Sequence, residues 1–222
     1  MRVLLVEDEP ALAESLSRVL TRAGFVVDHA ADGEEAHFLG DTEPYDAVVL
    51  DLGLPRLDGV GVLRRWRADG RRMPVLILTA RGGWSEKVAG FEAGADDFMA
   101  KPFEMEEVVY RLKALIRRSA GHGGPELTVG PLRYDTLSGR AWVEGRPLDL
   151  TAQEGRILSY LLHHAGRPVS RTEIIEHVYD RDFDLDSNVI DVLIGRLRRK
   201  LGVALIHTVR GLGYRLEAGE GE

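Results

Sequence analysis

The sequence predicts two domains: an α/β domain built on a five-stranded, doubly wound parallel sheet, followed by a smaller α+β domain. Over residues 1–118, short apolar runs alternate with amphipathic stretches, which is typical of a parallel sheet covered by helices. After residue 125 the pattern changes to short runs separated by turns, followed by helical stretches. A chain of 222 residues is also long enough to bury two hydrophobic cores.

The α/β domain begins with an apolar run at residues 2–6, which predicts the first strand. The first helix is predicted over 10–23, because Leu12 and Leu16 fall on one helical face, and Gly24 ends it. The same alternation predicts further strands at 25–30, 46–50, 75–79 and 96–100, and helices at 33–41, 58–69, 84–93 and 104–118.

The second domain follows a segment rich in small residues, where we expect a flexible linker. Turn signals between 127 and 150 predict a small antiparallel sheet. Two capping-box spacings, Thr151 to Glu154 and Ser170 to Glu173, each open an apolar periodic helix. The last predicted elements are a helix over 187–201 and a hairpin formed by 204–209 and 214–216. The resulting boundaries are 1–118 for the first domain, 119–125 for the linker, 126–217 for the second domain and 218–222 for a tail.

Composition excludes several classes of protein. The chain has no cysteine, so disulfides and thiolate metal sites are excluded. It has no apolar run near the roughly 20 residues that span a bilayer, and Met1 and Arg2 lead directly into a strand. We therefore expect no signal peptide, no membrane association and a cytoplasmic location.

The distribution of charge is uneven. The formal net charge of -7 argues against a protein that coats nucleic acid through bulk positive charge, and Asp and Glu outnumber Lys and Arg on both sides of residue 120. Residues 192–216 nevertheless contain no acidic residue. The basic residues of that segment are Arg196, Arg198, Arg199, Lys200, Arg210 and Arg215.

Polar residues follow or end four of the predicted strands: Glu7–Asp8, Asp51, Thr79 and Lys101. In an open parallel sheet such strand ends form the ligand-binding edge. Mg²⁺ prefers oxygen ligands, and a carboxylate beside it stays ionised and can attack phosphorus to give an acyl phosphate. Asp51 is the best candidate nucleophile, while Lys101 and Thr79 suit contacts to phosphoryl oxygens.

Residues 1–118 resemble the receiver domain of two-component response regulators. The strings that carry the resemblance are Val-Glu-Asp-Glu-Pro (6–10), Leu-Asp-Leu-Gly-Leu-Pro (50–55), Leu-Thr-Ala-Arg (78–81) and Gly-Ala-Asp-Asp-Phe-Met-Ala-Lys-Pro-Phe (94–103). The resemblance implies a flavodoxin-like sheet and phosphorylation of Asp51 by a sensor histidine kinase. It also implies a Mg²⁺ site formed by Glu7, Asp8, Asp51 and the Gly53 carbonyl, and a cis Lys101–Pro102 bond.

The same resemblance implies a switch. Phosphorylation adds about -1.5 to -2 charge, which would draw Thr79 toward the phosphate and let Phe98 turn inward. We expect this change to remodel the face formed by segments 84–93, 96–100 and 104–118 and to promote a homodimer. The residues on this face that match intersubunit ion pairs of related regulators are Lys87, Asp97, Glu107 and Arg111. A merely solvated charged face is the alternative.

The last predicted helix has two distinct sides. A projection at 100° per residue places one narrow apolar stripe at Ile190, Ile194, Leu197 and Leu201, which we expect to be buried. The opposite side carries Asn188, Val192 and Arg199, with Gly195 and Arg196 toward its edges. Asn suits adenine, Arg suits guanine or phosphate, and Val suits a thymine methyl, so this side is a candidate for contacts in the DNA major groove.

Residues 126–217 resemble the winged helix-turn-helix effector of the OmpR/PhoB family. The matching strings are Leu-Thr-Ala-Gln-Glu (150–154), Val-Ile-Asp-Val-Leu-Ile-Gly-Arg-Leu-Arg-Arg-Lys-Leu (189–201) and His-Thr-Val-Arg-Gly-Leu-Gly-Tyr-Arg-Leu (207–216). The resemblance implies that the last hairpin is a wing, with Arg210 at the DNA backbone or minor groove. Acidic residues surround the start of the recognition helix, and they either face RNA polymerase or belong to a solvated loop. These are Asp180, Asp182, Asp184, Asp186 and Asp191.

Together these features and resemblances predict a transcription regulator that dimerises when Asp51 is phosphorylated and binds adjacent DNA half-sites. The resemblance to the OmpR/PhoB family implies that these half-sites are direct repeats. We do not expect a turnover enzyme. Two alternatives are a Mg²⁺-dependent phosphatase with Asp51 as nucleophile, and a regulator that binds DNA constitutively. The phosphatase lacks a second acid close after Asp51 in the sequence.

Overall fold

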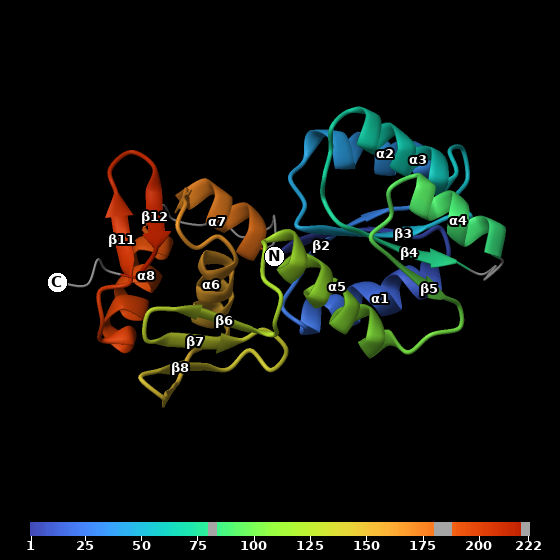
Figure 1. The fold of residues 1–222 in the computed structure, drawn as a ribbon. Helices are drawn as coiled ribbons and strands as arrows, with labels where there is room; N and C mark the ends of the chain where they lie inside the picture. The colour runs from blue at the N-terminus through green and yellow to red at the C-terminus, as the bar shows by residue number, and fades with distance from the viewer. Residues whose placement is uncertain (80–83, 180–187, 219–222) are drawn as a thin grey trace. The chain divides into compact units, whose positions relative to one another are not determined.

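The computed structural model describes residues 1–79, 84–179 and 188–218 (Figure 1). The chain divides into two compact units, Met1–Ser119 and Ala120–Glu222. Asp180, Asp182, Asp184 and Asp186, for which we expected either a polymerase contact or a solvated loop, lie outside the described residues. No helix in the described ranges combines the length and apolar character needed to cross a bilayer.

The described part of the first unit is built on the five-stranded parallel sheet that the sequence predicts. Its strands are β1 (Arg2–Val6), β2 (Val26–Ala30), β3 (Ala47–Asp51), β4 (Val75–Thr79) and β5 (Asp97–Ala100), in the spatial order β2-β1-β3-β4-β5. The chain runs from β1 to one side and later returns to pair β3 on the other side. The carboxyl ends of β1 and β3 therefore flank the point where the strand order reverses, which is where open α/β sheets bind ligands.

Helices cover both faces of this sheet. They are α1 (Pro10–Arg22), α2 (Gly33–Thr42), α3 (Gly59–Ala68), α4 (Trp84–Glu92) and α5 (Met105–Ser119). Alternate residues of β1 face opposite ways: Val3 and Leu5 pack in a core with α1 and α5, whereas Leu4 and Val6 pack in a core with α2 and α3. Because both faces are covered, the buried strands β1, β3 and β4 are apolar over most of their length, whereas the edge strands β2 and β5 also carry polar residues.

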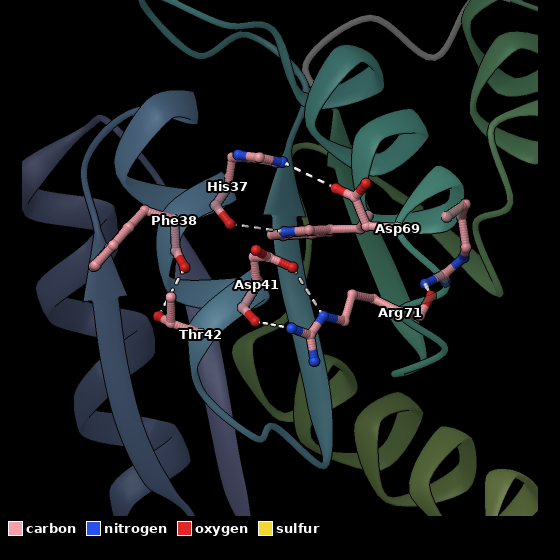
Figure 2. A network of polar contacts seen from close by, with 8 residues as sticks. His37, Phe38, Asp41, Thr42, Asp69 and Arg71 are labelled. Atoms are coloured by element: carbon pink, nitrogen blue, oxygen red, sulfur yellow. Dashed lines mark hydrogen bonds and ion pairs between the residues drawn. The ribbon is translucent and has the colours of Figure 1, made fainter.

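A polar network ties α2 to α3 (Figure 2). The Trp66 side chain is fully buried, and its Nε1 donates to the His37 carbonyl oxygen at 3.2 Å. A Cβ at Gly40 would lie 2.4 Å from the Trp66 ring, so glycine permits this close approach. Arg71 Nε donates to Asp41 Oδ1 at 3.0 Å beside it. These contacts fix the position of α3, the helix that follows the Asp51 loop in the sequence.

The second unit begins with an antiparallel sheet and continues with helices, as predicted. Within its described residues the first sheet has the order β6 (Glu126–Val129), β7 (Leu132–Asp135), β8 (Ala141–Val143) and β9 (Arg146–Leu148). The helices are α6 (Ala152–His163), α7 (Arg171–Val178) and α8 (Val189–Leu201). The predicted final hairpin consists of β11 (Ile206–Val209) and β12 (Gly213–Leu216).

A third strand joins this hairpin and was not predicted. The strand β10 (Pro168–Val169) pairs with β12, so the described residues form a sheet in the order β10-β12-β11. Two residues are too few to show a strand period. Gly213, with φ of 122°, permits the contact, because a Cβ there would lie 2.1 Å from the Val169 carbonyl oxygen.

The two predicted capping boxes differ in the structure. Thr151 and Glu154 form a complete box at the start of α6. At α7, Ser170 accepts from the Glu173 N–H at 3.0 Å, but the Glu173 carboxylate accepts from Tyr160 Oη at 2.9 Å and from Arg167 instead. The second box is therefore only half formed, because Tyr160 of α6 and Arg167, which precedes the helix start, hold the Glu173 carboxylate.

Candidate functional site

Three carboxylates meet at the point where the strand order of the first sheet reverses. Glu7 and Asp8 directly follow β1, and Asp51 ends the neighbouring β3. One oxygen of each carboxylate lies within 4.8 Å of one oxygen of the others. Glu7 and Asp51 are buried, whereas Asp8 is exposed. The cluster is therefore reached from the side of Asp8.

Lys101, which follows β5, extends into this cluster. Its Nζ lies 2.5 Å from Asp51 Oδ2 and 2.9 Å from Glu7 Oε2. The Gly53 N–H donates to Asp51 Oδ1 at 3.0 Å, so both oxygens of Asp51 have a donor. The Lys101–Pro102 peptide bond is cis, and the Lys101 N–H donates to the Thr79 carbonyl oxygen at 2.8 Å.

The charges in this cluster do not balance. Burial raises the pKa of Glu7, and the nearby charge of Asp51 adds to that rise, while the hydrogen bond from Lys101 opposes it. Burial acts to lower the pKa of Lys101, but its hydrogen bonds to Asp51 and Glu7 outweigh burial, and the net shift is upward. Carboxylates crowded in a poorly solvated site favour an added cation, and oxygen ligands of this kind suit a hard divalent ion.

Thr79 and Phe98 lie on the two strands beyond Asp51. Thr79 is buried at the end of β4, where the preceding residue, Leu78, is the register partner of Asp51. The Phe98 ring lies over α4, with its centroid 5.0 Å from that of Phe91. A Cβ at Gly90 would lie 2.4 Å from the Phe98 ring, so glycine leaves room for it there. The expected movements of Thr79 and Phe98 stay predictions.

Three of the four residues expected at a dimer interface pair with one another within the chain. Arg111 Nη1 lies 2.8 Å from Asp97 Oδ2, and Arg111 Nε donates to Glu107 Oε1 at 2.7 Å. The same residues line a shallow groove along α5 together with Tyr110, Ala114, Arg117 and Arg118. Lys87 is half-buried on α4. Among these residues, the structure thus brings Asp97, Glu107 and Arg111 into one ion network.

The two sides of α8 lie as the sequence predicts. The expected apolar stripe is buried, and Leu193 is buried beside it. Asn188, Val192, Arg196 and Arg199 are exposed, and Asn188 stands at the N-cap position. A Cβ at Gly195 would have no neighbouring atom within 4 Å, so this position is open. The exposed side of α8 is thus the side that the sequence marks as a candidate for DNA contacts.

Basic residues near the end of the chain separate into two groups. Arg198 donates to the Ile206 carbonyl and Thr208 Oγ1 at 2.9 and 2.7 Å, Lys200 pairs with Glu154 at 2.7 Å, and Arg215 pairs with Glu217 at 2.7 Å. These three residues stabilise the unit itself. Arg196, Arg199 and Arg210 are exposed and form the second group.

Sequence reasoning missed one contact in this region. It grouped Asp191 with the acidic residues around the start of α8, but the Asp191 carboxylate accepts two hydrogen bonds from Arg171 and one from Tyr214. These partners lie in α7 and β12, and no local sequence pattern links the three positions.

Comparisons with known proteins agree with this arrangement. Residues 3–113 match the family described as response regulator receiver domain, and residues 145–216 match the family described as transcriptional regulatory protein, C terminal. The chain is 46% identical over 218 residues to the two-component response regulator PhoP of Pseudomonas aeruginosa, covering 96% of this chain and 97% of that protein.

The chain belongs to the two-component response regulators, with an OmpR/PhoB-type DNA-binding domain.

Other relatives of this response regulator support the assignment over nearly the whole chain. It is 43% identical to the transcriptional regulatory protein QseB of Escherichia coli O157:H7, covering 97% of this chain and 99% of that protein. It is 45% identical to the transcriptional regulatory protein PrrA of Mycobacterium tuberculosis, covering 96% and 94%.

Solved structures resemble the first unit. The receiver domain of the Francisella response regulator 1452 matches with a TM-score of 0.52 and 34% identity, covering 53% of this chain and 98% of that one. A putative response regulator from Chloroflexus aurantiacus matches with a TM-score of 0.50 and 44% identity, covering 53% and 98%. The predicted fold class and the function as a transcriptional regulator of a two-component system are confirmed.

Proposed function

We propose that Asp51 of this response regulator accepts a phosphoryl group from a phosphohistidine of a sensor histidine kinase. In this step a carboxylate oxygen of Asp51 forms a bond to phosphorus as the bond between phosphorus and the histidine nitrogen breaks. The observation that supports it is the position of Asp51 between Glu7, Asp8 and Lys101, at the reversal point of the sheet. Both Asp51 oxygens have hydrogen-bond donors, so the nucleophile is held in one orientation.

The residues of the site also fit Mg²⁺. Glu7, Asp8 and Asp51 would hold it with their carboxylates, and Gly53 with its carbonyl oxygen. When bound, Mg²⁺ neutralises charge on the phosphoryl oxygens. The chain's own groups do the rest: Lys101 supplies a positive charge to a phosphoryl oxygen, and Thr79 donates its hydroxyl to another.

The signal then passes to the second unit. We propose that residues 1–118 act as the receiver, 119–125 as a flexible linker and 126–217 as the DNA-binding domain, with a tail at 218–222. Phosphorylation shifts Thr79 and Phe98 and favours a homodimer. Its interface contains Lys87, Asp97, Glu107 and Arg111.

In that dimer, α8 of each copy enters the major groove of one half-site. Asn188, Val192, Arg196 and Arg199 face the bases or phosphates, and Arg210 on the hairpin meets the backbone or minor groove. The half-sites are direct repeats about 10–11 bp apart, or roughly one DNA turn. We further propose that the regulator acts in the cytoplasm, contacts RNA polymerase when bound to DNA and turns over no substrate.

An Asp51→Asn variant tests the phosphoacceptor. Wild-type protein is expected to incorporate label from acetyl phosphate in the presence of Mg²⁺ and to bind selected DNA more tightly afterwards. The variant is expected to do neither. Equal labelling of the variant would place the acceptor elsewhere, and multiple turnover of phosphoesters by the wild type would instead indicate a phosphatase. DNA affinity that labelling leaves unchanged would indicate constitutive binding.

A further inference from the structure

A charged cluster in the second unit joins three elements through one carboxylate. Asp191 lies in the first turn of α8, and its Oδ1 and Oδ2 accept from Arg171 Nε and Nη2 at 2.7 and 3.2 Å. The Tyr214 hydroxyl donates to the same Oδ1. Arg171 is the first residue of α7 and Tyr214 lies in β12, so Asp191 links α7, α8 and the last hairpin.

The cluster extends into the hairpin through the Tyr214 ring, which is buried. The guanidinium carbons of Arg171 and Arg198 lie 5.3 and 5.9 Å from the centroid of this ring. Arg198 also donates to the Ile206 carbonyl and to Thr208 Oγ1 in β11. Two cations therefore flank the tyrosine that Asp191 holds, and both strands of the hairpin are tied to α8.

The charge of Asp191 is unexpected at this place. Its side chain is 42% exposed in the first turn of the helix proposed to enter DNA, where a free carboxylate would repel phosphates. The hydrogen bonds from Arg171 and then Tyr214 hold the pKa of Asp191 below its usual range, so it stays ionised at neutral pH. A two-point contact with a guanidinium also fixes the relative orientation of the two side chains.

We propose that Asp191 is a positioning residue for DNA recognition, an inference that rests on the DNA-binding function proposed above. It sets the orientation of α8 relative to α7 and to the β11–β12 hairpin. The exposed side of α8 and Arg210 can then reach their positions on one half-site together. The gain in affinity for DNA that comes from orienting α8 is larger than the loss that comes from repulsion between the Asp191 carboxylate and the DNA phosphates.

Repulsion and positioning predict opposite changes in the affinity of the Asp191→Ala variant for its selected DNA. If repulsion dominates, the affinity rises, and if positioning dominates, the affinity falls. The test uses the full chain, a duplex selected from random DNA and an unrelated duplex of equal length, at one fixed salt concentration. The positioning role predicts that the variant binds the selected duplex about tenfold more weakly or worse, while its affinity for the unrelated duplex is unchanged or slightly higher. The ratio of the two affinities therefore falls. A mere loss of folded protein would lower both affinities by the same factor and leave the ratio unchanged.

Four further variants sharpen the test, including Arg171→Ala alone and together with Asp191→Ala. Asp191→Asn keeps an acceptor for Arg171 and Tyr214, so its ratio of selected to unrelated DNA affinity is expected to fall less than that of Asp191→Ala. Glu176→Ala removes an exposed carboxylate from α7 and is expected to keep the ratio. In a double-mutant cycle, Arg171→Ala combined with Asp191→Ala is expected to lose no more than Asp191→Ala alone, because both changes remove the same contact.

The outcomes separate the two proposals. An unchanged or higher ratio in Asp191→Ala, or fully additive losses in the cycle, would overturn the positioning role while leaving DNA binding by the wild type intact. A wild type that fails to distinguish selected from unrelated DNA would overturn the DNA-binding function, and the role of Asp191 with it.

Discussion

Replacing Lys101 with methionine tests the charge balance of the strand-end cluster. The change keeps much of the side-chain length but removes the contacts of Nζ with Glu7 and Asp51. Those two carboxylate side chains are 1% and 9% exposed, so they would face each other without this positive charge. Breaking a buried ion pair by removing one partner costs about 3–5 kcal/mol. Because the Lys101 side chain is itself 18% exposed, we expect a smaller loss in the free energy of unfolding, about 2–3 kcal/mol.

The assay is urea unfolding of the full chain in the presence of a metal chelator, followed by tryptophan fluorescence. With a slope of roughly 2 kcal/mol per molar urea, the midpoint of the transition of the first unit is expected to fall by about 1–1.5 M. Arg64→Met is the control, because it removes an exposed positive charge from α3 of the same unit. An unchanged midpoint in Lys101→Met would refute the reasoning that this lysine neutralises the cluster.

Added Mg²⁺ gives a second readout on the same variant. A ligand at about 100 times its Kd stabilises the state that binds it by about 2.7 kcal/mol. In the wild type a bound cation has to share Glu7 and Asp51 with Lys101, whereas in Lys101→Met it supplies the missing charge. The midpoint of the variant is therefore expected to rise more with Mg²⁺ than that of the wild type, and equal rises would contradict the competition.

Three more predictions concern the two cores and the proposed DNA-facing side. Gly40→Ala is expected to lower the free energy of unfolding by about 1–3 kcal/mol in urea, because its Cβ would lie 2.4 Å from the Trp66 ring. Burial acts to raise the pKa of Glu154, but the bond from Lys200 and the backbone of Thr151 outweigh it, and the net pKa is lowered. The contribution of Glu154 to the free energy of unfolding is therefore complete above the ordinary glutamate pKa and is lost as the pH falls through the lowered pKa. Urea midpoints measured at a series of decreasing pH values are expected to show this loss in the wild type. The loss is expected to be smaller in Glu154→Gln. Arg199→Ala is expected to weaken DNA binding by about 1–3 kcal/mol with an unchanged urea midpoint, whereas Arg198→Ala is expected to lower both quantities, because Arg198 also holds β11.

The sequence predicts most of the fold because the patterns of apolar residues that mark strands and helices agree with the elements in the structure. In the first unit, strands buried on both faces are continuous apolar runs, and helices show one apolar side, so each element is visible locally. β10 shows why the rest was missed: it is two residues long and exists only because Gly213 allows β12 to approach Val169. Glu173 makes the same point for capping, since Tyr160 and Arg167 determine where its carboxylate lies.

The sequence predicts those residues of the candidate site that the topology of the parallel sheet brings together. The ends of parallel strands meet at one edge, so position in the sequence alone brought Glu7, Asp8, Asp51 and Lys101 together. Side-chain partners far along the chain follow no such rule. A run of basic residues therefore gave no sign that Lys200 pairs with Glu154, 46 residues away, while Arg199 stays exposed.

The ion network on the proposed dimer face constrains how phosphorylation can act. Arg111 already pairs with Asp97 and Glu107 inside the chain, so intersubunit pairs would replace existing contacts. Exposed ion pairs contribute only about 0–1 kcal/mol each, so exchanging one for another changes the free energy of dimerisation little. Such pairs determine which partner binds and how it is aligned more than they supply affinity. Affinity then has to come from apolar surface, and Phe91 on α4 is 54% exposed. Because the Phe98 ring lies against Phe91, a movement of Phe98 would alter that surface directly, which connects the proposed switch to dimerisation through a contact present in the structure.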